Sequence, residues 1–175
     1  PGTLSPGYLD NLLEAGVNRL SIGVQSFAKP ELALLGRIHS PSQAVDAIES
    51  ARKAGFANLS LDLMFGIPGQ NLASWQANLE KAIELKLEHL SLYSLILEPG
   101  TQLFDDVQAG RLQPASEDLS ADMYEFAMDA LGQEGFSHYE ISNWAKGEFF
   151  ESRHNKIYWK NQPYLGVGAG AHSSL

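Results

Sequence analysis

The sequence predicts an α/β protein in which parallel strands alternate with helices and form part of an open barrel. Segments of strand and helix character alternate along the first hundred residues, and the better strands have one apolar and one polar face. The 175 residues are 44% hydrophobic and 10% aromatic, which is typical of a globular fold. Strand–helix alternation favours parallel strands joined by right-handed crossovers. A chain of this length can bury a sizeable core.

The first predicted helix and strand follow directly from the sequence pattern. Ser5 is a good N-cap, Pro6 suits the first helical turn, and Gly16 ends the helix. Residues 19–25 then alternate strictly: the even-numbered positions are Leu, Ile and Val, and the odd-numbered ones are Arg, Ser, Gly and Gln. We expect a strand whose apolar face packs on helices.

The same unit repeats twice. Ser40 opens a helix with a capping box, and Gly55 ends it. Residues 59–64 alternate between leucines and a polar face that contains Asp62, Asn71 caps a third helix, and residues 89–97 form a third predicted strand. Strands of ordinary open α/β sheets are usually apolar on both faces. The recurring polar face therefore indicates a barrel lumen, with a solvent-facing edge strand as the alternative.

The pattern changes after residue 97. A helix is predicted from near Ser116, with Glu117 and Asp118 at its positive end, followed by a strand from Phe136 to Ile141. Residues 143–161 are polar and aromatic without clear periodicity, so we predict an ordered functional loop, with a flexible surface loop as the alternative. We divide the chain into a partial barrel, residues 1–112, and the start of a C-terminal extension, residues 113–175.

Composition excludes several classes of protein. The net charge of −9 argues against nucleic-acid binding, and no apolar run approaches the roughly 20 residues of a transmembrane segment. The chain has no cysteine, which excludes a disulfide framework and a thiolate metal site within it. No His and carboxylate cluster has zinc-site spacing. A cytoplasmic location is the default expectation, and a chain that begins at Pro1 is expected to be part of a larger protein.

Gln25 and Asp62 are the first candidate site residues. Both lie at or near the carboxyl ends of predicted strands, on the polar faces, where parallel barrels bind ligands. Asp62 can accept hydrogen bonds from ribose hydroxyls or an amino group, and Gln25 can both donate and accept. Purely structural roles are equally open, and a different class of enzyme would use Asp62 as a general base. Gly166-x-Gly168-x-Gly170 does not match a phosphate loop and is predicted to allow close backbone approach.

Longer motifs run through the whole chain. They are Gly23-Val24-Gln25-Ser26-Phe27, the segment 61–70 (LDLMFGIPGQ), His154-Asn155-Lys156-Ile157-Tyr158-Trp159, and the glycine-rich segment 166–172. Together they resemble the oxygen-independent coproporphyrinogen III oxidase family of radical S-adenosylmethionine (SAM) proteins, and within it the heme-chaperone branch. The resemblance implies the C-terminal half of a partial (β/α)6 TIM-like barrel plus the start of an extension. It also implies SAM and a [4Fe–4S] cluster whose cysteine ligands lie outside this chain.

The resemblance also implies roles for individual residues. In the family, the positions of Gln25, Arg37 and Asp62 contact SAM, the position of Ile96 gives an apolar contact to adenine, and His172 lies near a backbone contact. His154 would ligate heme iron, and the rings of Tyr158 and Trp159 would stack on the porphyrin. His172, His138 and His39 are the alternative heme ligands.

The implied function is that of a radical SAM heme chaperone, which binds heme and passes it to a recipient protein. The alternative within the family is a coproporphyrinogen III oxidase, which decarboxylates propionate side chains to vinyl groups and yields protoporphyrinogen IX. A cluster-free barrel enzyme is the alternative from another class. Without cysteines, this chain alone is expected to be inactive in radical chemistry, and its catalytic residues stay unassigned.

Overall fold

Three parallel strands form the centre of the sheet. The computed structural model describes residues 1–2 and 4–175. Strand β1 (Leu20–Gln25) pairs in parallel with β2 (Leu59–Phe65), and β2 pairs in parallel with β3 (His89–Ser94). The three predicted strands and their adjacent, parallel arrangement are confirmed. The third strand ends three residues earlier than predicted, at Ser94.

A hairpin extends this sheet on the β3 side. Strands β4 (Ser137–Glu140) and β5 (Asn143–Ala145) are antiparallel, and β5 pairs with β3, so the order is β1-β2-β3-β5-β4. The sheet therefore continues across the predicted boundary between residues 112 and 113. That boundary remains a prediction about the organisation of the protein, and it does not mark a break in the sheet.

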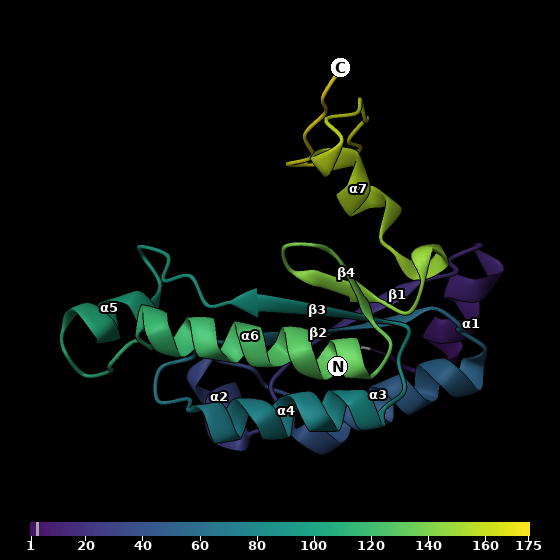
Figure 1. The fold of residues 1–175 in the computed structure, drawn as a ribbon. Coiled ribbons are helices and arrows are strands. Elements are labelled where there is room, and N and C mark those ends of the chain that lie inside the picture. Colours follow the sequence, from purple (N-terminus) through teal and green to yellow (C-terminus); the bar gives the residue numbers. More distant parts are fainter. Residues whose placement is uncertain (3) are drawn as a thin grey trace.

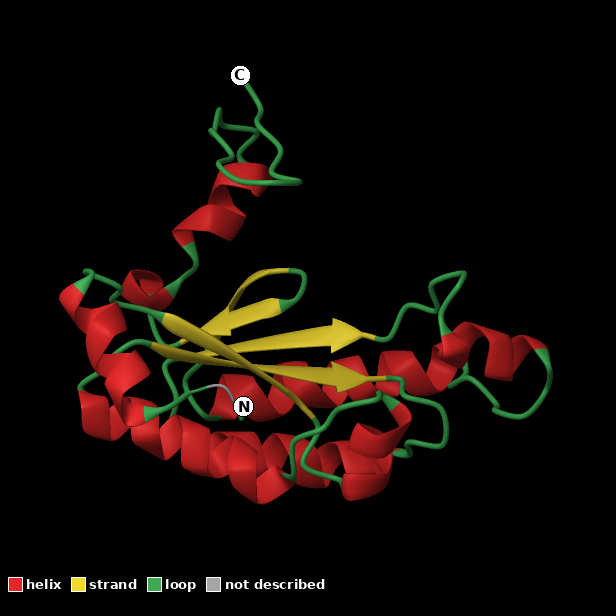
Figure 2. Ribbon diagram, turned by 180° about the vertical axis from the view of Figure 1, so that it is seen from behind, coloured by secondary structure: helices red, strands yellow, loops and turns green. Residues whose placement is uncertain are grey.

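Helices cover one face of the sheet. Figures 1 and 2 show α2, α3, α4 and α6 on the same side of the strands, while α7 and the C-terminal segment rise on the opposite side. The helices are α1 (Pro6–Glu14), α2 (Lys29–Leu34), α3 (Pro41–Ala54), α4 (Leu72–Glu84), α5 (Gln102–Gln108), α6 (Glu117–Gln133) and α7 (Arg153–Trp159), with a short 3-10 helix η1 (Glu148–Phe150). This one-sided covering is what a segment of a barrel wall requires.

The hydrophobic core lies between the sheet and these helices. The apolar positions of β1 and β2 are buried there, against Trp75 and Leu79 of α4, Met123 and Ala127 of α6, and neighbouring side chains. The indole of Trp75 donates a hydrogen bond to the Met123 carbonyl oxygen at 2.8 Å, which joins α4 to α6. The apolar strand faces thus meet the helices, as the alternating pattern predicted.

The predicted helix starts are confirmed by their capping hydrogen bonds. The side chains of Ser5, Ser40, Asn71 and Ser116 each accept a hydrogen bond from a backbone N–H three residues later. The Ser40 backbone N–H also donates to Gln43 Oε1 at 2.8 Å, which completes a capping box. Each such cap satisfies backbone donors that a helix N-terminus leaves open.

The prediction of a loop over residues 143–161 is wrong. The segment contains β5, η1 and α7, and Ser152 caps α7 by accepting from Asn155 N at 3.3 Å. These elements are three to seven residues long, too short for a hydrophobic period to become visible. The sequence analysis also did not predict α2 and α5, which are equally short. Within the described residues, no helix is long and apolar enough to span a bilayer.

Candidate functional site

The face of the sheet opposite the helices is polar. The register places Gly23, Asp62 and Ser91 side by side on neighbouring strands, with Ser60 and His89 one pair earlier. Ser60, Asp62 and Gly23 are positions that the alternating pattern of the first two strands assigned to a lumen. His89 and Ser91 extend this row of polar residues to the third strand, for which no polar face was predicted.

Asp62, Gly23 and Gln25 lie close together on this face. The Ser21 hydroxyl donates to Asp62 Oδ1 at 2.8 Å. A Cβ atom built on Gly23 would lie 2.9 Å from Gln25 Nε2 and 3.9 Å from Asp62 Oδ2. Any side chain at position 23 would therefore displace the Gln25 amide. The glycine at position 23 therefore leaves the space in which the Gln25 side-chain amide lies beside Asp62.

Gln25 takes an uncommon backbone conformation. Its φ is +69°, and the pairing with β2 shifts between Gly23 and Gln25, so a bulge re-aims the side chain. The following residue is firmly anchored: Ser26 Oγ donates to Glu31 Oε2 at 2.5 Å, and Phe27 N donates to Asn78 Oδ1 at 2.5 Å. The strained position is thus supported by buried polar contacts from α2 and α4.

Glu31 is the centre of that support, and the sequence analysis did not identify it. It is 7% exposed and accepts hydrogen bonds from Ser26, Gln70, Ser74 and Asn78, at 2.5 to 3.1 Å. The donors come from the turn after β1, the loop after β2, and α4. The sequence gives no sign that this carboxylate is buried, because an acidic residue in the first turn of a helix is common and is usually exposed.

Arg37 lies at the same edge of the sheet as Gln25. It belongs to the connection between α2 and α3, two residues before His39, whose Nε2 contacts the Val24 carbonyl oxygen at 3.0 Å. The Arg37 side chain is exposed and borders a pocket of about 210 Å³. His39 is buried and bonded to the strand, which fits a structural role.

Ile96 follows β3 at this edge and is 73% exposed. Its predecessor Leu95 donates to the Phe65 carbonyl oxygen at 2.9 Å, which ties this segment to the end of β2. The structure therefore brings four predicted SAM residues, Gln25, Arg37, Asp62 and Ile96, to the polar face or the carboxyl edge of the parallel strands.

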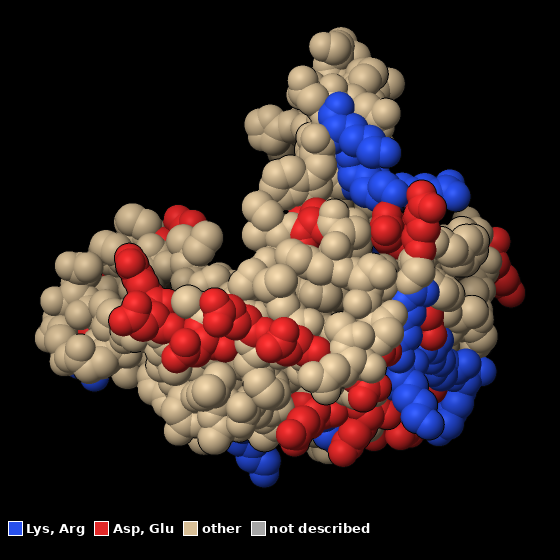
Figure 3. Space-filling model, viewed as in Figure 1, with Lys and Arg blue, Asp and Glu red and all other residues tan. Residues whose placement is uncertain are grey.

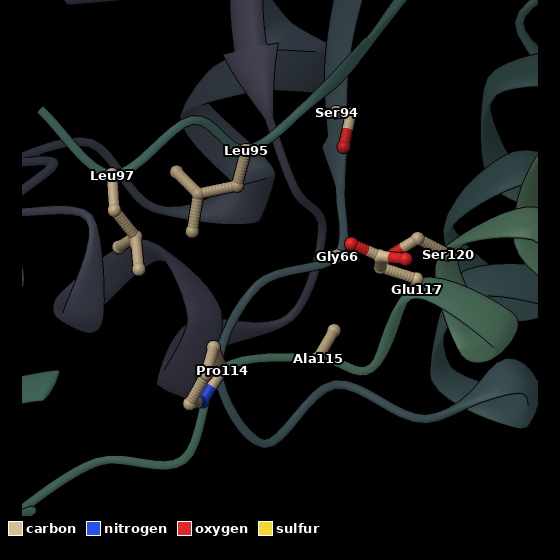
Figure 4. A pocket seen from close by; sticks show the side chains of 8 residues that line it. All are labelled: Gly66, Ser94, Leu95, Leu97, Pro114, Ala115, Glu117 and Ser120. Atoms are coloured by element: carbon tan, nitrogen blue, oxygen red, sulfur yellow. The ribbon is translucent and has the colours of Figure 1, made fainter.

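A separate pocket of about 400 Å³ opens at the carboxyl ends of β2 and β3. Figure 4 shows Leu95 and Leu97 on one side of it and Glu117 and Ser120, from the start of α6, on the other. A Cβ atom on Gly66 would lie 3.2 Å from Ser120 Oγ, so glycine allows this approach. The sequence analysis did not predict this pocket, since it forms only where the loop after β3 meets α6.

A buried hydrogen-bond chain runs across the amino-terminal half of the polar face. Ser60 Oγ lies 2.7 Å from His89 Nδ1, His89 Nε2 lies 2.8 Å from Tyr139 OH, and Tyr139 OH accepts from Ser152 N at 3.0 Å. Burial lowers the pKa of His89 to about 3, and the positive charge of Arg19 contributes to the shift. His89 is therefore neutral and joins the sheet to the segment before α7.

The His-Asn-x-x-Tyr-Trp motif is helix α7, and its spacing is that of one helical turn. Tyr158 OH lies 3.0 Å from His154 Nε2, and the two rings meet edge-on at 4.7 Å between centroids. Trp159 Nε1 donates to Glu140 Oε2 at 2.8 Å, which anchors α7 to β4. His154, Tyr158 and Trp159 are all exposed. Local desolvation, with a contribution from the neighbouring Tyr164, raises the pKa of Tyr158 above its ordinary value.

The other predicted histidines lie elsewhere. His138 stacks on Trp144 at 4.4 Å between ring centroids and approaches Tyr124 OH at 3.2 Å, an arrangement that fits a structural role. His172 lies in the C-terminal segment, and no hydrogen bond in the described residues joins it to Gln25 or Asp62. A Cβ atom on Gly166 would lie 2.1 Å from the His172 carbonyl oxygen, so glycine is required there for close backbone approach.

Comparison with known proteins gives the same family that the motifs indicated. Residues 1–82 match the Radical SAM superfamily. Heme chaperone HemW of Lactococcus lactis is 45% identical over 175 residues, which are all of this chain and 46% of that protein. HemW of Bacillus subtilis is 47% identical over the same length, again 46% of that protein. A zebrafish (Danio rerio) protein, radical S-adenosyl methionine domain-containing protein 1, mitochondrial, is 45% identical over 98% of this chain and 38% of its own length.

Solved structures show the same fold. The coproporphyrinogen III oxidase of Escherichia coli, described as a radical SAM enzyme, superposes with a TM-score of 0.79 at 23% identity, covering 98% of this chain and 42% of that one. The archaeal Elp3 of Methanocaldococcus infernus gives a TM-score of 0.64 at 23% identity, over 70% of this chain and 29% of that one. These likenesses establish the architecture: the five-stranded sheet and its helices share the fold of the matched segments of those two proteins.

The superfamily match over residues 1–82 and the shared fold make this chain similar to radical SAM proteins. More particularly, the whole chain is similar to bacterial heme chaperones HemW, and these matches are consistent with a HemW-like radical SAM protein of the coproporphyrinogen III oxidase family. It spans 46% of the length of the bacterial chaperones that it matches.

The residues present fit one of the two family cofactors. The polar groups around Asp62 suit SAM. The Ser21 hydroxyl donates to Oδ1 of Asp62, and the Gln25 side-chain amide lies near Oδ2, which can accept a further hydrogen bond. The cluster does not fit this chain, which has no cysteine. Within the described residues, no group of three His, Asp or Glu side chains could hold a metal ion. Cysteine ligands for a [4Fe–4S] cluster, which the superfamily implies, would have to lie outside these 175 residues.

Proposed function

We propose that this chain is the SAM-binding and heme-binding part of a radical SAM heme chaperone. The observation that supports this most is the similarity of the whole chain, at 45% and 47% identity, to bacterial heme chaperones. The exposed imidazole of His154 supplies a ligand that heme iron accepts. A heme-recipient protein is the partner that this function requires, and a cytoplasmic location remains a prediction.

At the carboxyl edge of the parallel strands, we propose that Gln25 and Asp62 hydrogen-bond to SAM. Asp62 Oδ2 would accept from a ribose hydroxyl or the amino group, and Gln25 would donate or accept beside it. Arg37 would pair with the SAM carboxylate, and Ile96 would cover the adenine. The cluster supplies the electron for radical chemistry when bound. The residues of this chain position SAM and exclude water from it.

On α7, we propose that His154 ligates the heme iron and that Tyr158 and Trp159 contact the macrocycle. In this structure Tyr158 OH is hydrogen-bonded to His154 Nε2. This hydrogen bond must break before the same nitrogen can bind iron. Heme is the cargo in this proposal, and the exposure of α7 suits a ligand that must be handed on.

The decisive test is the variant His154→Ala in the full-length protein. If His154 is the axial ligand, the variant should lower heme affinity and shift the Soret band of the complex, because iron loses its nitrogen donor. Equilibrium titration with hemin under reducing and oxidising conditions measures both. His138→Ala is the matched control, since that ring is stacked in the fold, and it should leave the spectrum unchanged.

The oxidase alternative gives a different outcome. The similarity in fold to the Escherichia coli enzyme is compatible with both the chaperone and the oxidase function. Conversion of coproporphyrinogen III to protoporphyrinogen IX by the reduced, SAM-loaded wild-type protein, without heme binding, would favour the oxidase. The match of residues 1–82 to the Radical SAM superfamily argues against a cluster-free barrel enzyme that uses Asp62 as a base.

A further inference from the structure

A third pocket lies at the end of the sheet opposite the proposed SAM site. It has a volume of about 670 Å³ and is bordered by the residues before β1 and β2 and by the chain from η1 to the start of α7. Its lining includes Arg19, Asn58, Phe149, Arg153 and His154. This volume is within the range of small-molecule sites, roughly 300–1,000 Å³.

Two guanidinium groups in this pocket have no acidic partner. None of the ion pairs in the described part of the chain involves Arg19 or Arg153. Glu151 also borders the pocket, but its carboxylate is paired with Lys156 at 2.5 Å.

Buried polar atoms in the wall also lack partners. Arg19 Nε and Asn58 Oδ1 are inaccessible to water and form no hydrogen bond within the described residues. Such groups cost about 1–3 kcal/mol each when left unsatisfied. Because water cannot reach them, these two atoms lie inside the wall of the pocket and are not themselves ligand-binding atoms.

The other side of the pocket is aromatic. Phe149 is 80% exposed and meets Phe150 edge-on at 5.3 Å between ring centroids. Figure 3 shows basic side chains along α7, and the 24 residues from Ser152 to Leu175 contain two Lys, one Arg and no acidic residue, in a chain of net charge −9. A ligand that suits this surface has a flat aromatic body and carboxylate groups.

We propose that this pocket binds the propionate carboxylates of a tetrapyrrole, with Arg19 and Arg153 as the carboxylate-binding residues and Phe149 against the macrocycle. The inference rests on the proposed heme-chaperone function, which brings such a ligand to His154 on the rim of the same pocket. Guanidinium groups bind carboxylates through short, charge-assisted and often bidentate hydrogen bonds. The two arginines would thereby orient the ring so that the iron faces α7.

The test compares hemin with hemin dimethyl ester, which keeps the ring and iron but has no carboxylate charge. In the full-length protein we expect hemin to bind at least about tenfold more tightly than the ester. Arg153→Gln and Arg19→Gln should each reduce hemin affinity about tenfold, the effect of losing roughly one charge-assisted bond, and leave ester affinity unchanged. Lys160→Gln removes the same charge just after α7, outside the pocket, and should leave both affinities unchanged.

Additional ligands and variants distinguish a failure of the carboxylate-binding inference from a failure of the proposed chaperone function. Coproporphyrin III, which has carboxylates and no iron, should lose affinity in Arg153→Gln but not in His154→Ala. Arg19→Lys, which keeps the charge near the buried wall, should recover part of the loss, and unchanged SAM affinity will show that each variant is folded. Hemin that binds and shifts the Soret band through His154, with equal affinity in the arginine variants, would overturn this inference and leave the chaperone function standing. No hemin binding by the wild-type protein would overturn both.

Discussion

At the scale of single residues, Asp62 is oriented by its own sheet before any ligand is bound. Its Oδ1 accepts from Ser21 on the neighbouring strand, and the glycine at position 23 leaves room for Gln25 on the other side. A side chain fixed in this way loses little freedom when it binds a ligand, so each hydrogen bond contributes more to affinity.

Asp62→Ala should weaken SAM binding by the full-length protein by about 1–3 kcal/mol, the scale of a lost buried hydrogen-bonding partner. Calorimetric titration with SAM measures it. Ser21→Ala should have a smaller effect, because it removes only the group that orients Asp62. An Asp62→Ala protein that is folded and binds SAM with wild-type affinity would place Asp62 among the structural residues.

His89 makes stability depend on pH. Burial and Arg19 lower its pKa from 6.5 to about 3, so between these values the unfolded chain binds a proton that the folded chain does not. The free energy of unfolding should therefore fall as the pH falls below about 6.5, by at most about 1.4 kcal/mol per pH unit, and level off below about 3.

Urea denaturation between pH 7.5 and 4.5 checks this dependence. His89→Gln should be less stable than the wild type at pH 7.5, and the difference should shrink towards pH 4.5. The exposed His172, changed to Gln, is the control and should follow the wild-type profile. Equal slopes for His89→Gln and wild type would show that His89 does not contribute to the pH dependence.

At the scale of elements, α2 and α4 fix the loops at the carboxyl edge of the sheet. Glu31 of α2 and Asn78 of α4 bond to the turn after β1, and Gln70 joins the same carboxylate from the loop after β2. These contacts hold the backbone on which Gln25 sits. The cluster therefore links helix packing to the geometry of the proposed SAM site.

Glu31→Ala should lower the free energy of unfolding by about 3 kcal/mol, because several buried donors lose their acceptor at about 1–3 kcal/mol each. Chemical denaturation measures this change. Glu80→Ala, on the exposed side of α4, should stay within about 0.5 kcal/mol of wild type. In the full-length protein, Glu31→Ala should also weaken SAM binding, since the bulge at Gln25 loses its anchor. Unchanged stability would show that water satisfies the cluster.

Element by element, prediction from the sequence succeeded where the signals were local. The capped helices beginning after Ser5, Ser40, Asn71 and Ser116 and the alternating strands were found, because capping and alternation are properties of a few neighbouring residues. Helix α7 was missed, because its seven residues are held by Trp159 on Glu140 and by Tyr139 on Ser152, contacts between distant segments.

At the scale of the whole molecule, the two proposed sites lie at opposite ends of the sheet. Gln25 and Asp62 lie towards the carboxyl ends of β1 and β2, whereas the pocket beside α7 is bordered by residues 18–19 and 57–58, before those strands. Figure 1 shows α7 rising from that second end, away from α5 and the loop after β3. The acidic side chains gather instead along α6 (Figure 3).

This separation predicts independent binding. In the full-length protein, His154→Ala should leave SAM affinity within about twofold of wild type. Asp62→Ala should likewise leave hemin affinity within about twofold, because substitutions at distant sites without shared partners usually act independently. Titrations of each ligand in both variants measure this. A tenfold or larger change in the SAM affinity of His154→Ala, or in the hemin affinity of Asp62→Ala, would show that the two sites are coupled. A tenfold change corresponds to a coupling free energy of about 1.4 kcal/mol.

The sequence by itself determined the α/β class, the order of the parallel strands, their polar and apolar faces, the helix caps and the family. These depend on patterns among neighbouring residues and on motifs that can be matched. Only the tertiary structure decided that Glu31 supports Gln25, that His89 is neutral and bonded to Tyr139, and that Arg19 and Arg153 share a pocket with His154. Gln25 and Glu31 stand 6 positions apart, His89 and Tyr139 50, and Arg19 and Arg153 134, and only packing of the helices and the hairpin on the sheet brings them together.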